Sequence, residues 1–318
     1  MRMMRWLALV ALLSCGPPPG TPVWTAPMTA PPPETDAPVD LRAAGVVVDR
    51  LTDFAFTGGH IELEMRRDGN RIIEVAYNHY AVPVVMAWQL ADLVNLEPTD
   101  ASGVALLPAA AKPNTPGAGV VVTTLAVIDP TQAYHRAFQL HVRFGDPQAR
   151  PADYAYRLPY ATGKTFSVLQ GFHGAFSHRG SNEYAVDFDC PVATKVLAAR
   201  PGVVVASNAA ALGAGTTPEF LEYARTNFVL VLHDDGTLGE YMHLAPSGVE
   251  VAPGDRIARG QEIALSGNTG FSSTPHLHFQ VMTAADDGVA AQSFPIRFAV
   301  TPKRVEEPVQ GRAYPGWE

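Results

Sequence analysis

Two histidines separated by a single residue, His276 and His278, are the residues of this chain best suited to chemistry. They lie in the mostly apolar run 274–279. Because strand side chains alternate with period two, both imidazoles are predicted to point from the same face of a strand. Neutral imidazole is a common zinc ligand. The pair therefore indicates a metal site, although two histidines with this spacing also occur on ordinary polar strand faces.

An acidic residue provides a second part of such a site. Asp187 follows His178 by nine residues and lies in the alternating segment 184–190. A carboxylate flanked by apolar residues needs a partner, because an unpaired buried charge is costly, and a metal ion is one such partner. Asp189, on the same expected face, is a candidate to orient a ligand imidazole. Cys190, on the opposite face, is expected to be a small buried hydrophobe and not a ligand.

Two more segments complete the pattern. In residues 240–244, Tyr241 and His243 are expected to share one strand face by the same alternation. Residues 266–270 contain a glycine-bracketed turn that leads directly into the strand with the paired histidines. The sequence contains no His-Glu-x-x-His motif, which excludes metalloproteases with a helical zinc site. It also contains no Gly-x-Ser-x-Gly motif, so a serine hydrolase with its nucleophile on an elbow turn has no support.

Taken together, these segments resemble the lysostaphin/LytM-type zinc metallopeptidases, which cleave peptide bonds in peptidoglycan cross-links. The resemblance spans roughly residues 158–298. Its motifs are His178…Asp187, Tyr-Met-His-Leu at 241–244, Gly-Asn-Thr-Gly at 267–270 and Pro-His-Leu-His-Phe at 275–279. Many members have a shorter gap between the first histidine and the aspartate. The longer gap here is similar to that of another branch and leaves the loop geometry open.

The resemblance implies a role for each of five residues. The zinc ligands would be His178, Asp187 and His278, and the catalytic histidines would be His243 and His276. A catalytic zinc ion takes three protein ligands and keeps one position for water, whose pKa it lowers, and it polarises the scissile carbonyl. One catalytic histidine would assist deprotonation of the attacking water. The other would stabilise the oxyanion or protonate the leaving amine, and the order stays open.

The amino-terminal residues resemble the export signal of a bacterial lipoprotein. Arg2 and Arg5 precede the apolar stretch 6–13, which is too short to cross a bilayer as a permanent helix. The sequence Leu-Leu-Ser-Cys at 12–15 resembles a lipobox, with Cys15 as the acylated residue and residues 1–14 as the signal peptide. An ordinary secretory signal with an incidental cysteine is the alternative.

The residues after the signal support an envelope location. Residues 15–40 are proline-rich and are expected to be an extended tether. A lipid on Cys15 would anchor the protein to a membrane and leave Cys190 without a disulfide partner. Gly16 after the lipidated cysteine resembles cargo of the outer membrane, facing the periplasm. Removal of residues 1–14 shifts the formal charge from −8 to −10, which gives no reason to expect a nucleic-acid partner.

The remaining chain is predicted to be mainly β, with two domains that have separate cores. Residues 41–151 favour an immunoglobulin-like β-sandwich with an accessory role. Residues 152–300 favour an antiparallel β catalytic domain of the LytM type. Residues 218–225 look helical and lie in the insertion 209–227, which is expected to wall a groove above the metal. Residues 301–318 are expected to be a poorly ordered tail.

The predicted strands follow from alternation and from turn residues between the runs. In the first domain Asp68 and Gly69 predict a hairpin. The predicted strands are 45–49, 61–65, 71–77, 82–86, 120–128 and 137–144 in the first domain, and 195–199, 203–207, 228–233, 238–243, 262–266 and 276–282 in the second.

The function implied by the resemblance is a zinc-dependent endopeptidase that acts on stem or bridge peptides of peptidoglycan. Two alternatives stay open: a non-catalytic LytM-type adaptor that activates another wall hydrolase, and a proteinase for glycine-rich proteins with the same site. Adaptors of this kind have typically lost zinc ligands or catalytic histidines. All five positions are filled here, which favours catalysis. The bond cleaved and the oligomeric state are left open.

Overall fold

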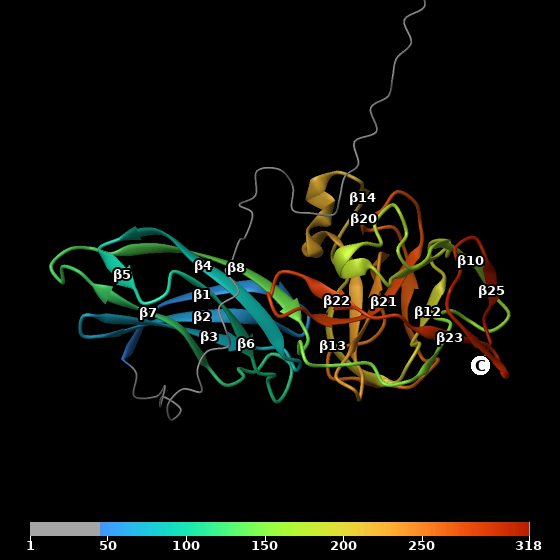
Figure 1. The fold of residues 1–318 in the computed structure, drawn as a ribbon, viewed down its shortest axis with the longest axis horizontal. Helices are drawn as coiled ribbons and strands as arrows, with labels where there is room; N and C mark the ends of the chain where they lie inside the picture. Colours follow the sequence, from blue (N-terminus) through green and yellow to red (C-terminus); the bar gives the residue numbers. More distant parts are fainter. Residues whose placement is uncertain (1–44, 318) are drawn as a thin grey trace, which may run out of the picture.

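The computed structural model describes residues 45–317, and its regular structure within this range is almost entirely β-strand (Figure 1). The only helical elements among the described residues are the 3-10 turns η1 (Gly180–Asn182), η2 (Pro218–Leu221) and η3 (Tyr223–Arg225). The predicted mainly β class is therefore confirmed. The helix expected over residues 218–225 is instead two short turns, because Glu222 between them has extended backbone angles.

The predicted signal peptide, the tether and the lipidated Cys15 lie outside the described residues, so they stay predictions. Within residues 45–317, no helix has the length and apolar character needed to cross a bilayer.

The amino-terminal part contains two antiparallel sheets. The larger has the order β1-β2-β3-β7-β5 and the smaller β6-β4-β8. The strands of the larger sheet are β1 (Val46–Phe56), β2 (Gly59–Asp68), β3 (Arg71–Asn78), β5 (Leu96–Pro98) and β7 (Val120–Val127), and those of the smaller are β4 (Val84–Val94), β6 (Ser102–Leu107) and β8 (His135–Phe144). The predicted hairpin joins β2 to β3: Asp68 pairs with Arg71, and Gly69 between them has a φ of 59°.

The two sheets pack on one hydrophobic core. Ile61 and Ile72 of the larger sheet and Met86 and Trp88 of the smaller one are buried in the same cluster. The immunoglobulin-like topology is not confirmed. In that fold the third strand belongs to the second sheet, whereas here β1, β2 and β3 stay together as a meander.

The carboxy-terminal part is built on one large sheet with the order β18-β13-β15-β16-β21-β11-β10-β25, and β22 pairs with β21. Its strands are β10 (Thr165–Gln170), β11 (Val186–Phe188), β13 (Gly202–Asn208), β15 (Phe228–Leu232), β16 (Leu238–Met242), β18 (Arg256–Ile257), β21 (Leu277–Ala284), β22 (Ala291–Ser293) and β25 (Ala313–Pro315). Smaller sheets accompany it, with the orders β12-β19-β17, β24-β23-β9 and β14-β20. Their strands are β9 (Ala155–Arg157), β12 (Lys195–Leu197), β14 (Ala214–Gly215), β17 (Leu244–Val249), β19 (Glu262–Ser266), β20 (Gly270–Phe271), β23 (Arg297–Thr301) and β24 (Arg304–Glu306).

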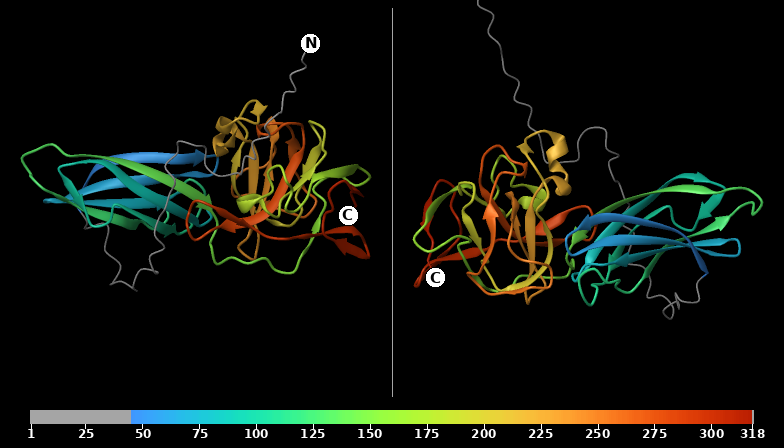
Figure 2. Two further views of the ribbon diagram at one scale, coloured as in Figure 1. Left: turned by 45° about the horizontal axis from the view of Figure 1, so that its top comes forward. Right: turned by 180° about the vertical axis from the view of Figure 1, so that it is seen from behind.

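The two faces of the large sheet pack against different parts of the molecule. Phe279 and Tyr241 on one face are buried in the core of the carboxy-terminal part. Leu230 and Met282 belong instead to the hydrophobic cluster of the amino-terminal sandwich. The two parts lie end to end and meet there, as both views of Figure 2 show. The core on one face of the sheet is therefore formed by the carboxy-terminal part alone, whereas the other face contributes to the core of the sandwich.

The end of the described chain is not the poorly ordered tail that composition predicted. β24 pairs with β23, and β25 pairs with β10 as an edge of the large sheet. Tyr314 is buried in the carboxy-terminal core, and its carbonyl accepts a hydrogen bond from the hydroxyl of Tyr160 at 2.8 Å. A single buried aromatic residue therefore ties a polar, proline-rich segment to the fold.

Candidate active site

Strand register assembles the centre of the site. Gln170 of β10 pairs with Asp187 of β11, Asp187 pairs with His278 of β21, and His278 pairs with Met242 of β16. Directly paired residues point from the same face of a sheet, so these side chains form one row across four strands. The carboxylate and the imidazole therefore meet although 91 residues separate them in the chain.

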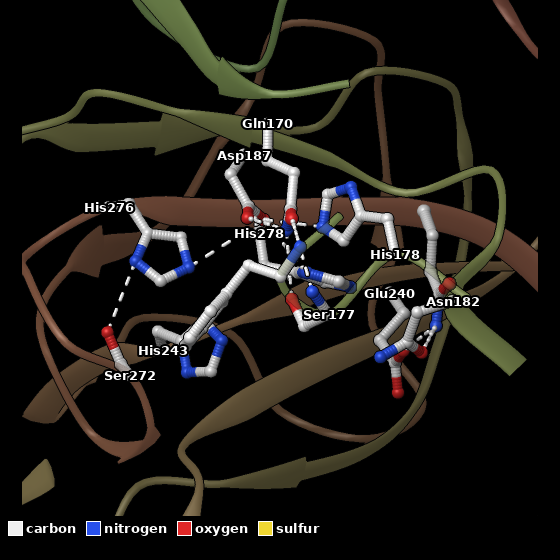
Figure 3. Close-up of polar contacts among 12 residues, drawn as sticks. Gln170, Ser177, His178, Asn182, Asp187, Glu240, His243, Ser272, His276 and His278 are labelled. Carbon is white, nitrogen blue, oxygen red and sulfur yellow. Dashed lines mark hydrogen bonds and ion pairs between the residues drawn. The ribbon is translucent and has the colours of Figure 1, made fainter. Parts of the chain in front are cut away.

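Three side chains converge at this row, as Figure 3 shows. The Nδ1 atom of His278 lies 3.0 Å from Oδ1 of Asp187, and the Nε2 atom of His178 lies 3.1 Å from Oδ2. His178 precedes η1 in a loop, and its Nδ1–H group donates to the carbonyl of Gly171 at 2.8 Å. One ligand atom from each residue lies within 4.8 Å of the others, and all three residues are buried.

The donor atoms of this cluster fit a zinc ion. Since a carbonyl only accepts, Nδ1 of His178 carries its proton, and in a neutral ring Nε2 then presents a lone pair. That buried nitrogen has no hydrogen-bond partner among the described residues, although a carboxylate oxygen lies 3.1 Å away. Two acceptors this close require a cation between them, either a proton or a metal ion. Two imidazoles and one carboxylate are a typical donor set of catalytic zinc.

The pKa shifts of the cluster favour ionised Asp187 and protonated His278 as an ion pair. Burial by itself would raise the pKa of Asp187, but the imidazoles of His178 and His278 outweigh it and hold that pKa well below its ordinary value. For His278, burial acts to lower the pKa, but the hydrogen bond and negative charge of Asp187 raise it. The aspartate is therefore an anion at neutral pH, as a metal ligand must be.

Two further imidazoles lie beside the cluster. The rings of His243 and His276 have centroids 4.5 Å apart, and Nε2 of His276 lies 3.6 Å from Oδ1 of Asp187. Each ring donates its Nδ1–H to a backbone carbonyl: His243 to Thr269 at 2.7 Å and His276 to Thr274 at 2.8 Å. The Nε2 atoms of both rings are thereby left to exchange a proton with another group.

His243 is held in its neutral form. Burial, followed by the nearby imidazoles of His276 and His278, lowers the pKa of His243 to about 3. At neutral pH this ring therefore keeps an unprotonated Nε2 with a lone pair. The structure thus brings together all five residues singled out in the sequence.

Two details of the sequence interpretation are wrong. His243 has a φ of 60°, which breaks the strand alternation, so it does not share a face with Tyr241. Tyr241 packs in the core, and its hydroxyl accepts from the amide of Ala199 at 2.7 Å. Asp189 does not orient a ligand: it is exposed and contacts the hydroxyl of Ser167 at 3.4 Å. Cys190 is buried and free, as interpreted.

Gln170 is a functional residue that the sequence interpretation missed. Its Nε2 donates to Oδ2 of Asp187 at 3.1 Å and to the hydroxyl of Ser177 at 2.9 Å. Its Oε1 accepts the backbone N–H groups of Phe176 and Ser177 at 2.8 Å and 3.1 Å. One amide therefore fixes both the carboxylate and the loop that carries His178. A lone glutamine at a strand end has no sequence signal for this role.

A cavity of about 570 Å³ lies over the cluster and is built from three parts of the chain. Its floor contains the site residues, including Asp187, His243, His276 and His278. Leu221 and Tyr223 of the insertion line it, as expected for a wall of the groove. Phe54, Arg143 and Phe144 of the amino-terminal sandwich line it as well. The accessory part therefore borders the site.

Comparison with known proteins gives matches to the carboxy-terminal part. Residues 181–291 match the family model described as Peptidase family M23, a segment that includes Asp187, His243, His276 and His278 and begins three residues after His178. The chain is 40% identical over 114 residues to the glycyl-glycine endopeptidase ALE-1 of Staphylococcus capitis. This match covers 36% of this chain and 28% of ALE-1. It is 36% identical over 96 residues to the peptidoglycan DD-endopeptidase ShyA of Vibrio cholerae serotype O1. This match covers 30% of this chain and 19% of ShyA.

Among solved structures, the catalytic domain of lysostaphin from Staphylococcus simulans matches with 32% sequence identity and a TM-score of 0.28. That match covers 42% of this chain and 88% of the lysostaphin domain. The curated relatives are matched over a much smaller share of their own length, 28% for ALE-1 and 19% for ShyA.

Proposed function

We propose that the protein is a zinc-dependent endopeptidase that hydrolyses peptide bonds in peptidoglycan cross-links, because its residues 181–291 match the model of Peptidase family M23. The observation that carries the proposal is the buried cluster of two imidazoles and one carboxylate, with two further imidazoles beside it in a cavity. The substrate class rests on the relatives, which include a glycyl-glycine endopeptidase and a peptidoglycan DD-endopeptidase.

In this proposal His178, Asp187 and His278 hold the zinc ion. When bound, such an ion supplies Lewis-acid polarisation of a carbonyl and lowers the pKa of a water molecule. Gln170 keeps Asp187 in place by its hydrogen bond to Oδ2. The Nδ1–H of His178 is held by Gly171, so Nε2 is the atom of that ring directed at the cluster.

His243 and His276 carry the proton transfers. Each ring has its Nδ1–H bound to a backbone carbonyl, which fixes the tautomer and leaves Nε2 as the reactive atom. One Nε2 takes the proton of the attacking water, and the other, on a ring that has first become protonated at Nε2 as well, stabilises the oxyanion or protonates the leaving amine. His243 is neutral at pH 7, and its lowered pKa makes it a weak base, so the order of the two roles stays open.

The place of action in this proposal is the bacterial cell envelope. The lipobox-like sequence ending at Cys15 supports a lipid anchor, and Gly16 supports the outer membrane, facing the periplasm. The proline-rich residues 15–40 would then hold the enzyme away from the membrane.

The decisive experiment uses residues 41–318. Bound zinc is measured, and purified sacculi are digested with and without a chelator. The proposal expects about one active-site zinc ion per chain, release of peptide fragments from sacculi, and loss of release with the chelator. Full zinc content without any cleavage, together with stimulation of a partner hydrolase, would favour the non-catalytic adaptor.

A further inference from the structure

A second group of metal-binding side chains lies outside the active site, at the end of the β2–β3 hairpin nearest the carboxy-terminal part. It consists of His60 and Glu62 on β2 and His79 directly after β3. The backbone N–H of His79 donates to the carbonyl of His60 at 3.0 Å, so the two histidines are cross-strand neighbours. Glu62 is two residues beyond His60 and therefore projects from the same face of the strand.

The three side chains converge on one point. The imidazole rings of His60 and His79 are stacked, with centroids 3.9 Å apart and an interplanar angle of 20°. Stacking brings both Nε2 atoms to the same carboxylate oxygen: Oε2 of Glu62 lies 3.2 Å from Nε2 of His79 and 3.9 Å from Nε2 of His60. One ligand atom of each residue lies within 4.8 Å of the others.

One buried nitrogen atom of this group lacks a hydrogen-bond partner among the described residues. His79 is only 7% exposed, and its Nε2 has no hydrogen-bond partner among the described residues. Oε2 of Glu62 lies 3.2 Å from this nitrogen, so both atoms can contact one shared cation. A buried polar nitrogen without a partner is costly. A cation between His79, His60 and Glu62 would satisfy this nitrogen and both neighbours at once.

The surrounding charges are compatible with a cation. The second oxygen of Glu62, Oε1, lies 3.2 Å from Nε of Arg50, so the two carboxylate oxygens serve different partners. Arg50 itself is bound closely by Glu64, at 2.7 Å. The side chains of His60 and Glu62 are 29% and 21% exposed, so an ion can enter from solvent and keep water as a further ligand.

We propose that His60, Glu62 and His79 form a second binding site for a divalent transition metal, with Zn²⁺ as the expected ion. Two imidazoles and one carboxylate suit zinc, and they repeat the donor types of the active site without sharing a residue with it. The proposal therefore holds whether or not the protein is a peptidase.

The site also lies close to the junction of the two parts. Thr57, three residues before His60, exchanges two backbone hydrogen bonds with Ser207 of the large sheet, at 3.1 Å and 3.0 Å. An ion that ties β2 to the end of β3 would stabilise the backbone next to this junction. Because a ligand that binds only the folded state raises its stability, zinc at this site should raise the unfolding temperature.

The test counts zinc ions on residues 15–318, the chain predicted to remain after export, with Cys15→Ser and no histidine tag. Metal-free protein is dialysed against Zn²⁺ buffered by a competing chelator, and bound zinc is measured by mass spectrometry. Two ions per chain are expected for this parent protein, one for Asp187→Asn and one for His79→Ala. His135→Ala, which removes an exposed histidine of the same sandwich, should keep two.

Affinity and stability give further readouts. His79→Ala should lower the affinity for the second zinc ion by more than about 100-fold. Loss of even an outer hydrogen bond to a metal ligand lowers metal affinity by about 10- to 100-fold. Asp187→Asn should still show a zinc-dependent rise in unfolding temperature, and addition of His79→Ala should abolish it. Glu62→Gln, which keeps the side-chain shape, provides a ligand variant if His79→Ala does not fold.

Several results would overturn the proposal. A parent protein that binds a single ion has only the active site. A second ion that persists unchanged in both His79→Ala and Glu62→Gln is bound elsewhere on the surface. If Asp187→Asn folds but binds no zinc, the three residues form only a hydrogen-bonded or ionic group.

Discussion

At the scale of single residues, the active site is defined by which imidazole nitrogen of each histidine is already hydrogen-bonded to the backbone. His178, His243 and His276 each donate Nδ1–H to a backbone carbonyl. This choice fixes the tautomer, so the chemistry falls to Nε2 in all three. His278 differs, because its Nδ1 faces Asp187. The partner of one ring nitrogen therefore decides which nitrogen of each histidine is left for chemistry.

The first prediction separates the two histidines of the His-x-His pair. His278→Ala should lose zinc and activity together, because it removes a proposed ligand. His276→Ala should keep most of the zinc and lose turnover by about 100- to 10,000-fold, the usual contribution of a general acid or base. Zinc content and sacculus digestion are measured on both. If His276→Ala loses zinc as readily as His278→Ala, the assigned roles are wrong.

The second prediction concerns Gln170. Gln170→Ala removes the donor to Asp187 and should lower zinc affinity by about 10- to 100-fold. Gln170→Glu is the matched variant, because it keeps the acceptor for the amides of Phe176 and Ser177 but places a second negative charge beside Asp187. Zinc titration of Gln170→Ala should show weakened binding, whereas Gln170→Glu, whose added negative charge attracts the cation, should bind zinc at least as tightly as the parent. Unchanged zinc affinity in Gln170→Ala would contradict the prediction.

At the scale of elements, the large sheet positions the site through register. The row Gln170, Asp187, His278 and Met242 exists only while β10, β11, β21 and β16 keep their pairing. A shift of one residue would turn each side chain to the other face. The edge strand β25 pairs with β10, next to Gln170, so the end of the chain supports the row from outside.

The third prediction tests this edge. Tyr314→Ala should lower the free energy of unfolding by about 3 kcal/mol, because the ring is buried in the core and its loss leaves a cavity. Tyr314→Phe keeps the ring but loses the bond from the amide of Val309 at 3.0 Å, which should cost about 1 kcal/mol. Denaturant unfolding measures both. Equal stability of Tyr314→Ala and the parent would mean that β25 is not part of the folded unit.

At the scale of the whole molecule, the amino-terminal sandwich and the large sheet share a hydrophobic cluster. Phe228, Leu230 and Met282 of the sheet are buried with the core of the sandwich. The same face of the sheet carries the active site further along, so the sandwich also lines the cavity through Phe54 and Phe144. Stability and access to the site are therefore both coupled to this contact.

The fourth prediction follows from the shared cluster. Residues 152–318 produced alone should expose Leu230 and Met282 and so bind a hydrophobic dye and unfold at a lower temperature than residues 41–318. Replacement of both by glutamine should restore solubility to the short chain, whereas the same change should destabilise the long one. A short chain as stable as the long one would show that the sandwich contributes nothing to the fold of the sheet.

The fifth prediction concerns pH. Burial lowers the pKa of His233 to about 4 from its ordinary 6.5, while the carbonyl of Pro201 accepts from its Nδ1 at 3.0 Å. The unfolded chain then binds the extra proton between these values, so this part of the stability is complete above pH 6.5 and is lost as the pH falls towards 4. The shift corresponds to about 3 kcal/mol. The free energy of unfolding, measured from pH 7 to pH 4, should fall less for His233→Asn than for the parent protein, because asparagine keeps a hydrogen-bond donor but does not titrate. Equal losses would contradict the prediction.

Local patterns in the chain were enough to predict much of this protein. Alternation predicted the β class and most strands, since the side-chain period of a strand is a local property. The residues His178, Asp187, His243, His276 and His278 were identified from their resemblance to the motifs of the lysostaphin/LytM-type family, which are short and local in the sequence.

Tertiary structure alone decided the features that depend on distant contacts. The packing of Met282 against the sandwich, the burial of Tyr314 and the hold of Gln170 on Asp187 have no local signature, because each depends on which strands become neighbours. The left-handed backbone of His243 likewise overrides the alternation that sequence spacing predicts. Residue types set the available chemistry, but strand pairing between segments far apart in the chain determines which atoms meet.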